Sequence, residues 1–146
     1  MKIELTKEQL ESLVKLVYLG NVMANSWRTK DVIEEFDDVE SLVLAAAKRN
    51  GLEDCVELDP EEKKRVPSAE LEDEMAEVVD FYDDNTFWDQ LIFRMADRDF
   101  ARKYGQEALD KLATEKGTDL EKPLLDKYEK EFNEHGLDRV EIRRDN

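Results

Sequence analysis

Pairs of acidic residues one helical turn apart are the residues in this sequence best suited to bind a ligand. Glu34, Glu35 and Asp38 form one group, and Glu77 and Asp80 form a second. Spacings of three and four residues place side chains on one face of a helix. Carboxylate oxygens are the ligands that Mg²⁺ prefers, so two such helices facing each other would form a magnesium site. These five residues are the candidate metal ligands.

The two acidic motifs resemble the Glu-Glu-x-x-Glu and Glu-x-x-Asp motifs of the all-α nucleoside triphosphate pyrophosphatases of the MazG type. The resemblance covers these two short segments, and Asp38 stands where the family has a third Glu. It implies that the five carboxylates would hold Mg²⁺ ions that bridge the phosphates of a nucleotide. A Mg²⁺-dependent nucleotide pyrophosphohydrolase is therefore one alternative function, and Mg²⁺ is the cofactor of that alternative alone.

The position of the second acidic group on its helix favours a simpler interpretation. At roughly 100° per residue, Glu77 and Asp80 lie roughly 150° from the centre of the apolar face of the same helix. A stripe of acids opposite the core is usually the solvated face of a helix. The magnesium site therefore requires this face to meet another helix, for example across a dimer. The apolar face consists of Leu71, Met75, Val78 and Tyr82.

Nucleophilic and redox chemistry have little support in the sequence. Cys55 and His135 are the only residues of their kinds. Cys55 lies in a short apolar stretch, which is typical of a small core residue. His135 is expected at a helix C-terminus, where the helix dipole favours it. A single cysteine also excludes a disulfide within the chain and suits a reducing compartment.

Composition excludes several classes of partner. The chain has 146 residues, with 38 acidic and 22 basic side chains and a net charge of −16. Such a chain repels phosphate backbones, so direct binding of nucleic acid is not expected. The same charge leaves open a second alternative, an acidic protein that mimics DNA. The sequence shows no signal peptide and no long apolar run, so we expect a cytoplasmic protein without membrane contact.

The spacing of apolar residues predicts a mainly α fold in one domain, residues 1–146. Five to six helices are expected to pack around a central first helix. Thr6 and Gln9 form a capping box that starts this helix at about residue 7. Residues 29–49 and 106–117 are further helices, and the last helix has Pro123 in its first turn.

The second half of the first helix carries apolar residues in several directions around its axis. A helix that is apolar nearly all round is normally buried, either inside the fold or in an interface between two chains. An alternative is that the helix shifts its buried face at Gly20. The candidate interface residues are Leu19, Met23 and Trp27.

Residues 80–89 contain four acidic residues and four aromatic residues. Asp84, Asn85 and Thr86 are all suitable N-cap residues, so this stretch is predicted to be the corner between two helices. The corner is interpreted as a structural joint, because it matches no known binding motif.

Asp99 continues the apolar stripe of the helix that follows this corner, so partial burial is expected. Arg28, on the inward stripe of the first helix, or Arg102, one turn away, could pair with Asp99. The candidate buried polar pair is Arg28 with Asp99, and a structural link is the favoured interpretation.

Both ends of the chain alternate between apolar and charged residues. Residues 1–5 and 140–142 are therefore predicted to be strands that pair in a small antiparallel sheet.

The favoured function is a non-enzymatic one: a protein-interaction module that self-associates, as a homodimer, without a cofactor. The apolar excess on the first helix and the acidic stripes elsewhere support this interpretation.

Overall fold

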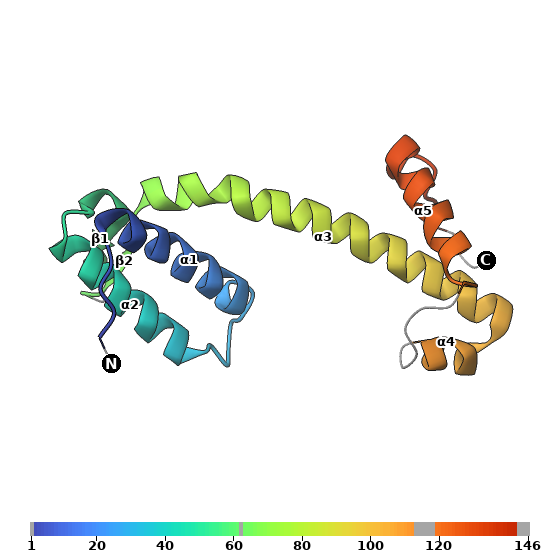
Figure 1. Cartoon of the computed structure of the whole chain (residues 1–146), viewed down its shortest axis with the longest axis horizontal. Coiled ribbons are helices and arrows are strands. Elements are labelled where there is room, and N and C mark those ends of the chain that lie inside the picture. The colour runs from blue at the N-terminus through green and yellow to red at the C-terminus, as the bar shows by residue number, and fades with distance from the viewer. Residues whose placement is uncertain (1, 62, 113–118, 143–146) are drawn as a thin grey trace. The chain divides into compact units, whose positions relative to one another are not determined.

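The computed structural model describes residues 2–61, 63–112 and 119–142, and this part of the chain is mainly helical. It contains five α-helices and one sheet of two antiparallel strands (Figure 1). The chain divides into two units, Met1–Phe81 and Tyr82–Asn146. Among the described helices, none combines the length and the apolar character needed to cross a lipid bilayer. The single domain over residues 1–146 and the central place of the first helix stay predictions.

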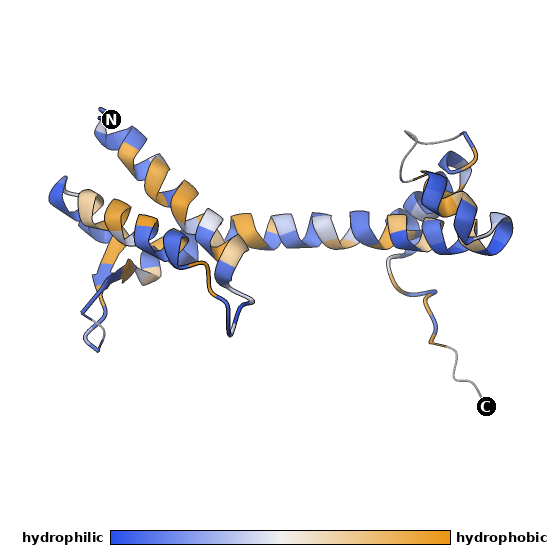
Figure 2. Ribbon diagram, turned by 90° about the horizontal axis from the view of Figure 1, so that it is seen from below, coloured by the Kyte–Doolittle hydropathy of each residue, from blue (hydrophilic) through white to orange (hydrophobic). Residues whose placement is uncertain are grey.

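Unit 1 is built on a hairpin of two helices, α1 and α2, with a small sheet and the start of α3 packed against it. Apolar and polar residues alternate along the ribbons of both helices, as an amphipathic pattern requires (Figure 2). The helices are α1 (Lys7–Asn25), α2 (Glu34–Arg49) and α3 (Ala69–Tyr104), and a 3-10 turn covers Glu53–Cys55. The buried core consists of Leu10, Val14, Leu44, Ala47, Leu52, Val56, Leu71 and Met75.

The capping box at the start of α1 is confirmed. The Thr6 hydroxyl accepts a hydrogen bond from the Gln9 N–H at 3.2 Å, and the Gln9 side chain accepts one from the Thr6 N–H at 2.9 Å. The predicted start of the second helix at residue 29 is wrong, because α2 begins at Glu34. Asp31 adopts a positive φ of 59°, a left-handed conformation that a helix cannot contain.

The small sheet is confirmed, but the strands predicted at the two ends of the chain are not. β1 (Val56–Leu58) pairs with β2 (Arg65–Pro67). Two backbone hydrogen bonds of 2.9 Å close the turn between them, from the Asp59 N–H to the Lys64 carbonyl and from the Lys63 N–H to the Asp59 carbonyl. Residues 2–5 and 140–142 belong to no strand, and Met1 lies outside the described residues. Alternation alone does not make a strand, since each strand also needs a neighbour for its backbone hydrogen bonds and a buried side.

The predicted corner at residues 80–89 is also wrong, because α3 continues through it without a break. Asp84, Asn85 and Thr86 each cost less than about 1 kcal/mol in a helix interior, and no glycine or proline lies between Ser68 and Gly105. The indole N–H of Trp88 donates to the Asp84 carboxylate at 3.2 Å, an i,i+4 bond that suits the helix. N-cap residues start a helix only where the preceding chain is not already helical.

Unit 2 packs α5 against the C-terminal part of α3. The shorter helix α4 (Gln106–Leu112) follows Gly105, and residues 113–117 of the helix predicted there lie outside the described residues. Pro123 stands in the first turn of α5 (Lys122–His135), as predicted. The core of this unit is formed by Ala96, Tyr128 and Phe132, with Trp88, Leu91, Ile92, Met95, Leu124 and Leu125 partly buried around them.

Ser68 holds the start of α3 and gives a first test of unit 1. Its buried hydroxyl donates to the Asp54 carbonyl and accepts from the Leu71 N–H at 3.2 Å. Ser68→Ala is expected to lower the free energy of unfolding by about 1–2 kcal/mol, since the buried Leu71 N–H and the partly buried Asp54 carbonyl both lose their partner. Urea denaturation measures this, with Ser12→Ala on the exposed side of α1 as the control. An equal effect of both substitutions would contradict the role of Ser68.

Candidate protein interface

A set of hydrogen bonds made by two asparagine side chains of α1 connects α1 to α2 and to the residue before it. The Asn21 amide donates to Asp37 at 3.0 Å and to Glu40 at 2.9 Å. The Asn25 amide donates to the Asn21 side chain at 2.8 Å, and its oxygen accepts from the Ile33 N–H at 2.9 Å. Burial raises the pKa of Glu40, while the Asn21 amide acts in the opposite direction. Asn21, a partly buried polar residue of α1, therefore finds hydrogen-bond partners on α2.

Two grooves lie on the hairpin, and both have mainly apolar linings. The smaller has a volume of about 230 Å³ and is lined by Val17, Gly20, Asn21, Phe36 and Val39. The larger has a volume of about 560 Å³ and lies between the N-terminal segment and both helices. Its lining residues are Ile3, Leu5, Thr6, Lys7, Leu10, Leu13, Leu42, Val43, Ala46, Arg49 and Asn50. We call the residues that line these two grooves the hairpin face.

The hairpin face contains no carboxylate among the described residues that line it. Its charged residues are Lys7 and Arg49, both basic. This is a marked local difference in a chain with 38 acids among 146 residues. Leu42 is 68% exposed, and Phe36 and Val39 are also exposed. Exposed apolar residues gathered along the same two helices make this face a candidate site of interaction.

The three residues predicted for an interface on α1 occupy different environments. Leu19 is half-buried and packs against the core of unit 1. Met23 and Trp27 are exposed, and the Arg28 guanidinium lies 4.4 Å from the centre of the Trp27 ring. The role of these residues in an interface stays a prediction.

The five acids predicted to bind Mg²⁺ all belong to unit 1, and all are exposed. Glu34, Glu35 and Asp38 lie on α2, while Glu77 and Asp80 lie on α3. In the described part of the chain, no three acidic, histidine or cysteine side chains are gathered closely enough to hold a metal ion. The structure of one chain therefore does not bring the two motifs together, and magnesium binding stays a prediction.

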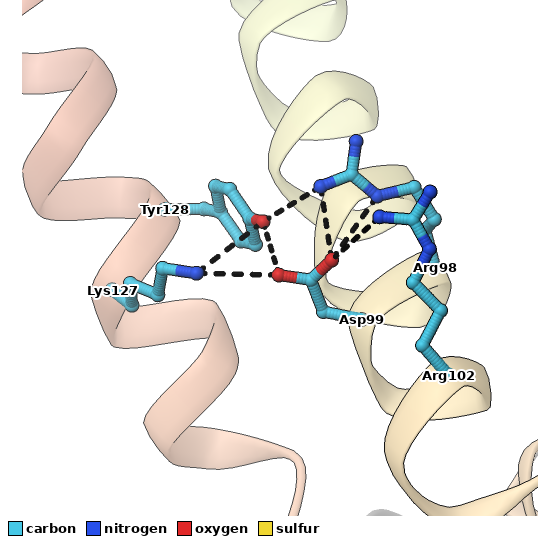
Figure 3. A network of polar contacts seen from close by, with 5 residues as sticks. All are labelled: Arg98, Asp99, Arg102, Lys127 and Tyr128. Carbon is cyan, nitrogen blue, oxygen red and sulfur yellow. Dashed lines mark hydrogen bonds and ion pairs between the residues drawn. The ribbon is translucent and has the colours of Figure 1, made fainter.

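Asp99 lies at the centre of a polar network that joins α3 to α5 within unit 2 (Figure 3). Its carboxylate accepts from the Tyr128 hydroxyl, from Arg98 at 2.9 Å and from Lys127 at 3.2 Å. Arg102, one of the two partners expected for this carboxylate, lies 3.7 Å away. The hydrogen bond from Tyr128, together with those from Arg98 and Lys127, lowers the pKa of Asp99 to about 2, although partial burial opposes this shift.

Arg28, the other expected partner, belongs to unit 1. There its guanidinium donates to the Ala24 carbonyl at 2.8 Å and to the Asp31 carbonyl at 3.2 Å. The pairing of Arg28 with Asp99 stays a prediction. Sequence reasoning missed Lys127 and Tyr128 as partners of Asp99, because both lie on α5, 28 and 29 residues further along the chain. The hydroxyl of Tyr128 was the feature of the sequence that could have indicated this contact, since a buried tyrosine usually needs a hydrogen-bond partner.

The two residues considered for nucleophilic chemistry lie in ordinary positions. Cys55 is half-buried beside the core of unit 1, and burial raises the pKa of its thiol. A thiol with a raised pKa is a poor nucleophile at neutral pH. His135 is the last residue of α5, as predicted, and its ring lies 3.6 Å from Glu134.

No protein family model, no curated protein and no solved structure matches this chain. The arrangement of its own residues is therefore the basis for a functional conclusion.

Proposed function

We propose that this chain is a protein-interaction module that self-associates through the hairpin face. The observation that supports the proposal best is the absence of carboxylates among the described lining residues of that face. The part of α1 that lines the two grooves would become covered in the associated form.

The charge of the chain favours a second copy as the occupant of the hairpin face. Two chains that each carry a net charge of −16 repel each other over most of their surfaces. They can meet at low cost only where acids are missing, because like charges placed together in an interface are unfavourable. A basic protein partner would bind the acidic surfaces instead, and would find no carboxylate to pair with on this face.

The apolar character of the hairpin face provides the attraction. Leu13, Val17, Phe36, Val39 and Leu42 would all lose contact with water when a second copy covers them. Burial of apolar surface contributes roughly 25 cal/mol for each Å² that is removed from water. The centre of a homodimer interface is typically apolar, with charged residues kept to its rim.

Val39→Glu tests this proposal. We expect the wild type to associate reversibly in sedimentation velocity runs between low micromolar and submillimolar concentrations, and Val39→Glu to weaken the association at least about tenfold. Val78→Glu on α3 is the matched control, because Val39 is 50% exposed and Val78 is 47% exposed. Trp27→Glu applies the same test to the α1 residues predicted for the interface.

Two outcomes would count against the proposal. The first is a wild type that remains a monomer throughout the concentration range. The second is an equal loss of association with Val39→Glu and Val78→Glu, which would show that added charge acts without regard to its place. Circular dichroism of every variant excludes unfolding as the cause.

A further inference from the structure

Three residues of α2 form a line that is suited to pairing with a second copy of the same helix. Glu35, Leu42 and Arg49 are spaced by seven residues each. A seven-residue spacing drifts by only about 20° around a helix, so the three side chains share one side of α2. Leu42 stands at the centre of this line and is strongly exposed. We call Glu35, Leu42 and Arg49 the α2 line.

The two ends of the α2 line carry opposite charges and are free to pair. Glu35 lies in the acidic first turn of α2, and Arg49 lies in its basic last turn. Neither side chain makes a hydrogen bond or ion pair with any part of the chain that the structure describes. The line is therefore apolar in the middle, negative at one end and positive at the other.

From this arrangement we propose that two copies of the chain pair their α2 helices antiparallel, around a two-fold axis that passes close to Leu42. The inference rests on the proposed function: Leu42 and Arg49 belong to the hairpin face, and Glu35 is a residue of α2 outside its lining. Because Glu35 and Arg49 are equally far from Leu42, the axis places Glu35 of each copy opposite Arg49 of the other. One symmetric contact thus forms two ion pairs around a central pair of leucines.

The other charges of α2 favour the antiparallel direction as well. Its acids are Glu34, Glu35, Asp37, Asp38 and Glu40, all in the N-terminal half, and its bases are Lys48 and Arg49. An axis near Leu42 places Asp38 opposite Ala46, so no acid of α2 faces an acid. A parallel pairing would instead bring the acidic halves of both helices together, which is strongly unfavourable for like charges.

Cross-linking tests the position of the axis. In a Cys55→Ala background, Leu42→Cys is expected to form a covalent dimer with a short bismaleimide, because the axis brings the two thiols together. Glu35→Cys is the matched control on the same line. Its two copies would lie about 20 Å apart along the antiparallel helices, since each residue adds about 1.5 Å. A mixture of Glu35→Cys and Arg49→Cys chains should link to each other.

Charge reversal tests the ion pairs without changing the central leucines. Glu35→Arg alone and Arg49→Glu alone are each expected to weaken association about tenfold, since each places like charges together at two points. The double variant, which restores both pairs in reverse, should recover association to within about twofold of the wild type. Asp73→Arg on α3 is the control, because it makes the same change in net charge as Glu35→Arg.

An effect of net charge alone on association would have the opposite sign, so the Glu35→Arg measurement distinguishes it from the proposed geometry. Glu35→Arg reduces the net charge from −16 to −14, so general repulsion would fall and association would become stronger. The proposed geometry requires it to become weaker. Stronger association with Glu35→Arg, or efficient self-cross-linking of Glu35→Cys, would overturn the antiparallel geometry.

The failure of this inference can be separated from the failure of the proposed function. If the wild type associates and Val39→Glu disrupts it, but neither reversal has an effect, the hairpin face is the interface and the antiparallel α2 pairing is wrong. If the wild type does not associate at all, both proposals fail together.

Discussion

Phe132→Ala is expected to lower the free energy of unfolding of unit 2 by about 3–5 kcal/mol, the usual cost of removing a buried aromatic ring. Phe132 is 6% exposed and lies between two other rings. Its centroid is 5.9 Å from that of Trp88 and 5.9 Å from that of Tyr128. The truncation would therefore remove both ring contacts at once and leave a cavity between α3 and α5.

The effect should be large because the core of unit 2 has few buried members. The buried hydrophobic side chains of this unit, among the described residues, are Ala96, Phe100, Tyr128 and Phe132. A small core loses a large share of its stability when one ring is removed. We expect α5 to separate from α3 at neutral pH in the Phe132→Ala variant.

Tryptophan fluorescence during guanidinium denaturation measures this loss. A Trp27→Phe background leaves Trp88 as the only tryptophan, so the signal reports on unit 2. Phe93→Ala is the matched control, because Phe93 lies on the same helix and is 47% exposed. A Phe93→Ala variant as unstable as Phe132→Ala would show that the ring cluster is not the core of this unit.

The second large effect is a loss of stability in acid that depends on Asp99. The pKa of Asp99 is about 2 in the folded chain, below its ordinary value of 3.8. A carboxylate with a lowered pKa stabilises the fold when it is charged, so its contribution is complete above about pH 4. It is lost as the pH falls from about 4 to about 2, and we expect a loss of about 1–2 kcal/mol.

Asp99→Asn separates this contribution from that of the other acids. The variant should be less stable than the wild type at pH 7, and the difference should disappear as the pH approaches 2, where Asp99 also loses its charge. Asp89→Asn, an exposed acid on the same helix, is expected to change stability little at any pH. A difference for Asp99→Asn that stays constant with pH would mean that the Asp99 charge does not stabilise unit 2.

Local signals in the sequence predicted the helices well where a cap and a periodic face occur together. The capping box of Thr6 and Gln9 and the place of Pro123 are both confirmed. Each of these depends on residues within a few positions of one another. The interactions that form these features therefore involve only a short segment of sequence.

Errors arose where a local signal required a condition elsewhere in the chain. The cap residues at Asp84–Thr86 would start a helix only after a break, and α3 has none there. The alternation in residues 2–5 would form a strand only beside a partner, and the structure gives those residues no strand. The sheet instead formed at Val56–Leu58 and Arg65–Pro67, which a tight turn brings together.

The candidate site was predictable in part. The apolar residues of α1 predicted an interface, which stays a prediction. The two grooves that define the hairpin face depend on α1 and α2 lying side by side, and the spacing within α1 alone does not show this. The partners of Asp99 show the same limit, because Arg102 lies one turn away in sequence whereas Tyr128 lies on another helix. Contacts between distant segments depend on the fold and not on spacing.

The lack of acids among the lining residues of the hairpin face has a consequence for the kinetics of the proposed self-association. Charges outside a contact change how often two molecules meet, while the groups inside it set how long they stay together. Raising the ionic strength screens the repulsion between two chains of −16 at distances beyond about 10 Å. Salt would therefore act chiefly on the encounter rate of two copies, and the apolar contact would govern the lifetime of the pair.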